Sequence, residues 1–244
     1  MNINELGVQS YCFRHFKDNA QVAQLVRECG LDKIELCAVH VDFSKPETFG
    51  AIIETYRAAD VEIVSVGVQR IVGDDGERNF FEFARQAGAK FMAVTFGIAS
   101  VPQSYRAAEK LAQEFDMKLA IHNHGGYDWL GSAAALEHAF NSTNERIGLC
   151  LDTAWALDAG EKPLALCDRF ANRLYGVHIK DFIFDRARKP QDVVVGTGNV
   201  DLPALVQQIV TNPQVGYAVL EYEGDVENPV PALQSCVAAV RAAS

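Results

Sequence analysis

The chain has 244 residues, of which 49% are hydrophobic, and its formal net charge is −10. This length suits one large α/β domain, and the acidic balance argues against a basic groove of the kind that binds DNA or RNA. The start of the chain does not resemble a targeting segment, and no apolar run approaches the roughly 20 residues that span a bilayer, so we expect a soluble, cytoplasmic protein. The six cysteines have no close pairs, and we interpret them as reduced core residues.

Strand-like and helix-like segments alternate along the chain. We expect strands at 6–12, 33–37, 62–68, 90–96, 118–124, 147–152, 174–180 and 217–222. We expect helices at 18–29, 44–59, 77–87, 102–115, 132–140, 163–170, 201–210 and 229–242. Ser44, Pro46 and Glu47 form a capping-box pattern, and Ser132 and Asp201 are further N-cap candidates.

These segments make eight βα units of about thirty residues each, which is the count and size of a (β/α)₈ barrel. We therefore predict one α/β domain of this type over residues 1–244. A doubly wound open sheet is the alternative. The barrel is favoured because the ionisable residues follow the strands, and the active site of such barrels lies at the carboxyl ends of the strands.

Four strands end in residues that bind metals. His122, Asp152, His178 and Glu221 close the fifth to eighth expected strands. In an open sheet these four ends could not all turn toward one point, whereas a barrel allows them to converge. Two imidazoles and two carboxylates at one point would form a site for a divalent ion. A single histidine is more often a structural residue, but the matching positions favour metal binding.

The segments AIHNHG, CLDTAW, VHIKD, GTGNVD and LEYEGD, in this order, resemble the xylose isomerase-like TIM-barrel superfamily. That family holds sugar isomerases and epimerases, inosose dehydratases, hydroxypyruvate isomerases and AP endonucleases. The resemblance covers the whole chain and implies one divalent ion, most often Mn²⁺, with Mg²⁺, Co²⁺ and Zn²⁺ as alternatives. Carried over, the metal ligands are His122, Asp152, His178 and Glu221.

The resemblance implies a sugar, sugar phosphate or keto acid isomerase or epimerase that acts through an enediolate. Ketose epimerases of this family have a glutamate on strand five, where this chain has His122. A symmetric epimerisation by two glutamates is therefore in doubt, although Glu221 can still transfer a proton on one face. The alternative is a lyase that expels a β oxygen from a keto sugar or inosose. A third reading, a nucleic-acid role like that of the endonuclease branch, lacks the many ligands of a trinuclear zinc cluster.

We expect four catalytic residues, which are Glu221, Lys180, His124 and Glu35. Glu221 would be the base, and Lys180 or His124 would stabilise the enediolate or act as an acid. Glu35 would point to the barrel mouth and bind sugar hydroxyls or carry a second proton. The alternatives are structural, because Lys180 could pair with Asp152 or Glu223, and Glu35 could pair with Lys180.

Three further residues are candidates for substrate binding, which are Trp155, Glu223 and Arg70. Trp155 could stack on the apolar face of a sugar, although aromatic residues at strand ends are as often packing. Arg70 could hold a phosphate or carboxylate, although a solvated loop arginine is the simpler interpretation. The expected partner is a small-molecule substrate from carbohydrate metabolism, and a homo-oligomer is an open alternative.

The segment Gly196 to Asp201, GTGNVD, resembles a dinucleotide-binding fingerprint. Asp201 occupies the third glycine position, and no second nucleotide-binding half follows. We interpret the segment as a glycine turn that leads to an Asp-capped helix over the pocket.

Overall fold

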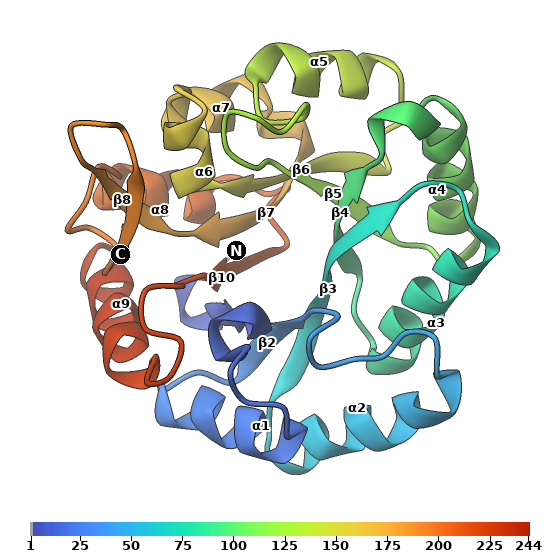
Figure 1. The fold of residues 1–244 in the computed structure, drawn as a ribbon, viewed down its shortest axis with the longest axis horizontal. Helices are drawn as coiled ribbons and strands as arrows, with labels where there is room; N and C mark the ends of the chain where they lie inside the picture. Colours follow the sequence, from blue (N-terminus) through green and yellow to red (C-terminus); the bar gives the residue numbers. More distant parts are fainter. Residues whose placement is uncertain (1) are drawn as a thin grey trace.

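Eight parallel strands close into a barrel, and helices form a ring around it (Figure 1). The computed structural model describes residues 2–244. Neighbouring strands follow the order β1-β10-β7-β6-β5-β4-β3-β2 and close on β1. The strands are β1 (Gly7–Gln9), β2 (Lys33–Leu36), β3 (Glu62–Ile71), β4 (Phe91–Phe96), β5 (Lys118–His122), β6 (Ile147–Asp152), β7 (Leu174–Ile179) and β10 (Tyr217–Leu220). The predicted (β/α)₈ barrel is confirmed, and the open sheet is wrong.

The helices cover the outside of the barrel (Figure 1). They are α1 (Asn19–Glu28), α2 (Phe49–Ala58), α3 (Arg78–Ala87), α4 (Gln103–Glu114), α5 (Ala133–Asn141), α6 (Thr153–Asp158), α7 (Pro163–Arg169), α8 (Leu202–Thr211) and α9 (Val230–Ala242). The predicted N-caps Ser132 and Asp201 are both confirmed, because their side chains accept the backbone N–H of Ala135 and Ala204.

Alternation along each strand separates two cores. On β5, Leu119 and Ile121 belong to the large hydrophobic cluster that joins the barrel to its helices, whereas Ala120 belongs to a smaller inner cluster with Cys150 and Tyr217. Side chains two residues apart share a face of a strand. The inward positions of β5, β6 and β10 therefore continue toward the strand ends, where the polar residues of the barrel mouth begin.

Two predicted element boundaries are wrong. The strand expected at 6–12 is only Gly7–Gln9, because the Gln9 side chain accepts the Tyr11 N–H and begins a 3₁₀ turn at Ser10. The predicted capping box at Ser44 does not form, because Lys45 and not Ser44 occupies the N-cap position of the first turn. The N–H and the hydroxyl of Ser44 both donate to Asp42 Oδ1. That helix begins with a 3₁₀ turn at Pro46–Thr48, without a side-chain cap.

Two elements were not predicted. The short helix α6 follows β6 directly, and an antiparallel hairpin of β8 (Asp181–Phe184) and β9 (Pro190–Val193) fills the loop after β7. The hairpin projects beside α8 and α9 at the edge of the barrel (Figure 1). Both elements start next to residues of the barrel mouth, and α6 contributes Trp155 to the cavity there.

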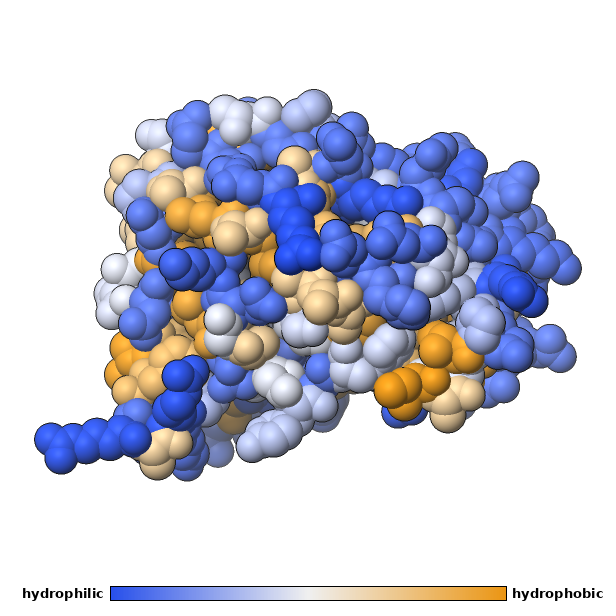
Figure 2. All heavy atoms as spheres, turned by 90° about the horizontal axis from the view of Figure 1, so that it is seen from above, coloured by the Kyte–Doolittle hydropathy of each residue, from blue (hydrophilic) through white to orange (hydrophobic). Residues whose placement is uncertain are grey.

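The surface and the cysteines agree with the composition. All six cysteines are buried free thiols, as predicted. No helix within residues 2–244 is both long and apolar enough to cross a membrane. On the face drawn in Figure 2, hydrophilic residues predominate and hydrophobic residues form separate groups.

Candidate metal centre

Four neighbouring strands deliver four donor side chains to one point. His122 and Asp152 are the last residues of β5 and β6, His178 lies near the end of β7, and Glu221 follows β10 directly. The register pairs Asp152 with His178 across β6 and β7. Because β5, β6, β7 and β10 are consecutive in the barrel, their inward side chains meet at its carboxyl end.

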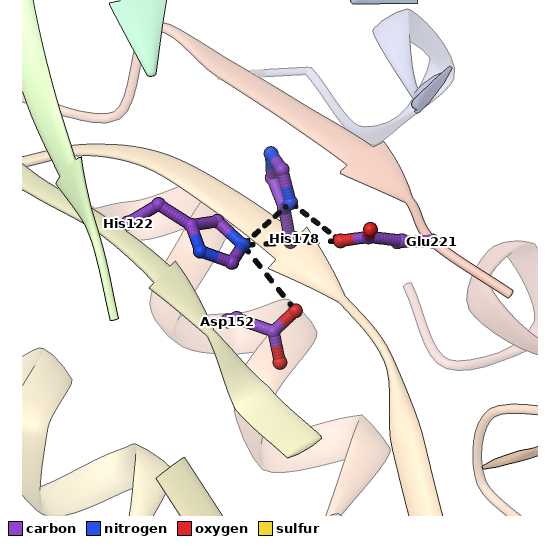
Figure 3. A group of neighbouring side chains, drawn as sticks. All are labelled: His122, Asp152, His178 and Glu221. Carbon is purple, nitrogen blue, oxygen red and sulfur yellow. Dashed lines mark hydrogen bonds and ion pairs between the residues drawn. The ribbon is translucent and has the colours of Figure 1, made fainter. Parts of the chain in front are cut away.

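The distances between the donor atoms suit one bound ion. His178 Nδ1 lies 3.1 Å from His122 Nε2 and 2.8 Å from Glu221 Oε2 (Figure 3). His122 Nε2 lies 3.5 Å from Asp152 Oδ2 and 3.8 Å from Glu221 Oε2. One donor atom of each residue lies within 4.8 Å of all the others. Ligands that surround one ion at about 2.1 Å lie roughly 3 to 4 Å apart, so the four atoms could hold a single metal.

Asp152 carries a donor atom that has no hydrogen-bond partner within residues 2–244, although it lies near His122. Its Oδ1 accepts the Trp155 N–H at 2.8 Å and caps α6. Its Oδ2 is fully buried and has no hydrogen bond. An unsatisfied buried oxygen costs about 1–3 kcal/mol, and more when it is charged. A cation at this point would remove that cost, so the residues fit a metal ion on structural grounds as well as by their chemistry.

Neighbouring charged groups, together with burial, set the pKa values of Glu221 and His178. Burial alone would raise the pKa of Glu221, but the Lys180 ammonium and the two imidazoles hold it well below its usual range. Burial would lower the pKa of His178, but its contacts, including those with Glu35 and Glu221, hold it well above its usual range. The Glu221 carboxylate is therefore ionised, which is the form that binds a cation.

A cavity of about 380 Å³ opens onto the cluster. His122 and Glu221 form its floor, His124 and Trp155 form part of its wall, and Val39, Val68 and Tyr11 contribute apolar surface. A second cavity of about 400 Å³ lies at the amino ends of β2 and β3, between Lys33, Arg57 and Glu62. That cavity has no donor cluster, so we assign the functional site to the first.

Lys180 lies directly after β7 and is completely buried. Its ammonium forms an ion pair with Glu223 rather than with Asp152 or Glu35. It also lies 5.2 Å from the ring centroid of Trp155. Glu223 lines the cavity, and its Oε2 forms a second ion pair with Arg14 Nη2, at 3.5 Å. The Glu223 carboxylate is thus held by two positive charges.

His124 lies beyond the end of β5, on the wall of the cavity. Its ring centroid is 4.6 Å from that of His122 and 6.0 Å from that of Trp155. Burial, followed by the neighbouring His122, lowers the pKa of His124 to about 4. His124 is therefore a neutral imidazole at neutral pH.

Two sequence expectations need correction. Glu35 does not point to the barrel mouth, because it is fully buried behind His178 and its Oε1 lies 2.8 Å from His178 Nε2. Its partner is this histidine and not Lys180. Arg70 does not follow β3 but lies within it, where it pairs with Thr95 of β4 and is exposed. Arg70 is not among the residues that line the cavity.

The GTGNVD segment wraps a side chain of the protein itself. The backbone N–H groups of Gly196 and Gly198 donate to Asp181 Oδ2, and those of Asn199 and Val200 donate to Oδ1, all at 2.8–3.0 Å. The loop amides that would cradle a phosphate in a nucleotide-binding loop are therefore occupied by a buried carboxylate.

Three residues near the site were not anticipated. Gln9 contacts Glu35, Asp181 fixes the glycine loop, and Asp192 Oδ1 on β9 accepts the Glu223 N–H at 3.3 Å. Burial, opposed by Lys180, raises the pKa of Asp192 to about 6. The inward direction of Gln9 could have been predicted, because Gly7, two residues earlier on the same strand, lies on the inward face. Asp192 could not, because its hairpin lacks a clear strand pattern.

The chain is similar to a group of known proteins. A family model described as the xylose isomerase-like TIM barrel matches residues 23–241. The rhizopine catabolism protein MocC of Rhizobium meliloti is 32% identical over 138 residues, which cover 51% of this chain and 42% of that protein. The inosose dehydratase of Clostridium beijerinckii is 26% identical over 137 residues, which cover 49% of this chain and 46% of that protein. The chain thus spans less than half the length of the curated relatives that it matches.

The crystal structure of the 3-keto-D-glucoside 4-epimerase YcjR from E. coli, in its apo form, is similar to this chain with a TM-score of 0.76. The match covers 98% of this chain and 99% of that one at 17% sequence identity. This likeness shows a shared fold.

Proposed function

Because the chain belongs to the xylose isomerase-like TIM-barrel family, we propose that it is an enzyme that removes the proton beside the carbonyl of a keto sugar or inosose. The observation that carries this proposal is the convergence of two imidazoles and two carboxylates next to a cavity that His122 and Glu221 line. The coarse conclusion, an enzyme of a sugar-modifying family, follows from family membership. The metal dependence, the residue roles and the reaction are our proposals.

We propose that His122, Asp152, His178 and Glu221 hold one divalent ion, with Mn²⁺ as the expected metal. The unpartnered Asp152 Oδ2 supports this assignment. A divalent ion held there would polarise the carbonyl of the substrate as a Lewis acid and so make the adjacent C–H group more acidic.

Glu221 is the base in this proposal. It lines the cavity, and the contacts drawn in Figure 3 involve only one of its two carboxylate oxygens. Its low pKa keeps it ionised at neutral pH, ready to accept a proton. Lys180 supplies a positive charge that offsets the negative charge of the enediolate, and Trp155 offers a face for the apolar side of the ring.

The arrangement favours elimination over a two-base epimerisation. Glu35, the expected second proton carrier, is buried behind His178, and Glu223 is held by Lys180 and Arg14. Glu221 is therefore the carboxylate best situated to act as a base on the substrate. Elimination needs one base, which takes the C–H proton, and one proton for the departing oxygen. Lys180 is the candidate for that donor, because the neutral imidazole of His124 has no acidic proton to give. The inosose dehydratases among the relatives support the same choice.

A metal-dependent isomerase or epimerase is the second candidate. The carboxylate of Glu221 can return its proton to the neighbouring carbon on the same face of the enediolate, which interconverts a ketose and an aldose. This route also requires one base, so it is compatible with the position of Glu35.

A reaction in D₂O tests both outcomes. The Mn²⁺-loaded protein is incubated with inososes, ketoses and 3-keto glycosides, and the products are followed by mass spectrometry and NMR. Loss of water or of the aglycone supports the lyase, whereas deuterium incorporation with an unchanged skeleton supports the isomerase. Glu221→Gln should abolish both, and Arg70→Gln, outside the cavity, should leave them intact. Turnover that persists in the Glu221→Gln variant would contradict the proposal.

A cytoplasmic location stays a prediction of the sequence, and a homo-oligomer stays an open alternative.

A further inference from the structure

A chain of buried hydrogen bonds connects the start of the barrel to His178. The Tyr11 N–H donates to Gln9 Oε1 at 3.0 Å, and Gln9 Nε2 donates to Glu35 Oε1 and to the Gly67 carbonyl. Glu35 Oε1 in turn lies 2.8 Å from His178 Nε2. Gln9, Glu35 and His178 are each at most 1% exposed. The chain crosses the barrel interior from β1 and β2 to β7.

The direction of each bond is fixed by chemistry. An ionised carboxylate only accepts hydrogen bonds, so the ring nitrogen that faces Glu35 must carry a proton. In the neutral imidazole that would ligate a metal, the single N–H group stays on Nε2, so Nδ1 of His178 offers its lone pair to the ion. That nitrogen is the one that faces His122 and Glu221 in the cluster.

We propose that Glu35 is a positioning residue, which fixes the ring orientation and tautomer of His178 so that Nδ1 is offered as a metal ligand. This inference rests on the proposed metal site. It differs from the proton-carrying role expected from the sequence, since His178 stands between Glu35 and the cluster and Glu35 does not line the cavity. A carboxylate behind a ligating histidine also increases the basicity of the ligating nitrogen.

Gln9 fixes Glu35 in the same way that Glu35 fixes His178. The Gln9 amide oxygen is occupied by the Tyr11 N–H, so its NH₂ group must face Glu35 and Gly67. Glu35 Oε1 therefore receives two donors, while its Oε2 is buried without a partner. The carboxylate cannot rotate without losing both bonds, and the imidazole it holds is oriented as a result.

Two substitutions of Glu35 and one control variant distinguish positioning of His178 from a general effect on the stability of the protein. Glu35→Leu removes the acceptor, and Glu35→Gln keeps an oxygen acceptor but removes the charge. Glu77 is a matched control, because its carboxylate is also buried but accepts the N–H groups of Val72 and Gly73 away from the cluster. Circular dichroism and thermal melting establish that each variant is folded.

Mn²⁺ affinity is measured by calorimetry, and ligand geometry by the visible absorption of the Co²⁺ form. Glu35→Leu should weaken Mn²⁺ binding by about 10–100-fold and change the Co²⁺ spectrum, whereas Glu35→Gln should weaken it by less than about tenfold. Glu77→Gln should alter neither. Wild-type affinity and an unaltered spectrum in a folded Glu35→Leu variant would overturn the inference.

The ring proton of His178 gives a readout without metal. In the metal-free wild-type protein, NMR with ¹⁵N-labelled histidine should detect a low-field proton on His178 Nε2, since its acceptor is charged. This resonance should move upfield in Glu35→Gln and stay in place in Glu77→Gln. An unshifted resonance in Glu35→Gln would overturn the inference even if Glu35→Leu does not fold. If the wild-type protein binds no divalent ion, the proposed function is wrong. If the wild-type protein binds Mn²⁺ and the Glu35 variants bind it equally well, only the role of Glu35 is wrong.

Discussion

Asp152 and Trp155 are joined by a hydrogen bond in which the carboxylate Oδ1 caps the first turn of α6 and the other oxygen faces His122. The Asp152 side chain therefore caps α6 with one oxygen and faces the proposed metal site with the other, and variants of this residue can separate the two roles. Asp152→Asn keeps a capping oxygen but places an NH₂ group in the cluster, so Mn²⁺ affinity should fall at least about 100-fold while stability without metal changes by less than about 1 kcal/mol. Calorimetry and urea unfolding measure the two effects.

Asp152→Ala is the companion variant, because it removes the cap as well and should cost a further ~1 kcal/mol of stability. Mn²⁺ at 100 times the wild-type Kd should stabilise the wild-type protein by about 2.7 kcal/mol and the two variants by no more than about 0.4 kcal/mol. Equal stabilisation of all three proteins by Mn²⁺ would show that the ion binds elsewhere.

The buried Asp181 carboxylate should be a major source of local order. Asp181→Ala removes the acceptor of four backbone N–H groups in residues 196–200, and we expect a loss of about 2–4 kcal/mol in the free energy of unfolding. Hydrogen exchange of those four amides should accelerate. Asp185→Ala, at the exposed tip of the hairpin, is the control and should leave these amides protected. Unchanged exchange in Asp181→Ala would contradict this assignment.

His40 should make stability depend on pH. Burial, together with nearby Lys17, lowers the pKa of His40, and its Nε2 lies 3.0 Å from the Phe16 carbonyl. The unfolded chain therefore binds a proton more readily than the folded one. The contribution is complete above the unfolded pKa of about 6.5 and is lost as the pH falls from there toward the lower folded value.

His40→Gln, which can still donate to Phe16, should reduce this loss. The comparison is the free energy of unfolding of the two proteins in urea at pH 7.5 and at pH 5.5. The same fall in stability in both proteins would mean that other groups cause it.

Trp155 should affect substrate binding and not metal binding. Its indole lines the cavity, and it contacts His124 and the Lys180 ammonium. Trp155→Ala should raise KM about tenfold, since stacking on an aromatic ring contributes on the order of 1 kcal/mol, and leave the Mn²⁺ affinity within about twofold. Trp129→Phe is the matched control, because Trp129 donates to the Phe96 carbonyl and is not a cavity residue. An unchanged KM in Trp155→Ala would remove Trp155 from the binding site.

Local patterns predicted the barrel because strand and helix periods alternate along the sequence. The same alternation predicted that His122, Asp152, His178 and Glu221 would meet, since each ends a strand at an inward position. The sequence could not predict how far along the barrel axis each inward side chain would lie. Glu35 has the same inward direction as the other four residues, yet it lies behind His178, because the stagger of β2 against its neighbours depends on the closed ring.

The hairpin of β8 and β9 was not predicted from the sequence for a different reason. Its strands have four residues each and include Pro190, and the burial pattern of β9 is only partial. Short strands without a clear hydrophobic face are set by tertiary contacts, here through Asp181 and Asp192. The capping box at Ser44 was also wrong, because the first turn has Lys45 at its N-cap and the Ser44 N–H and hydroxyl form a turn with Asp42.

The pairing of β1 with β10 has a consequence for biosynthesis. Gly7 and Val8 pair with Val219 and Leu220, so the strand that leads to Glu221 is held by residues from the opposite end of the sequence. A nascent polypeptide still attached to the ribosome and lacking β10 has three of the four donors and an open ring. The proposed metal site is therefore complete only when β10 has joined the ring, so binding of the ion should follow the pairing of β10 with β1.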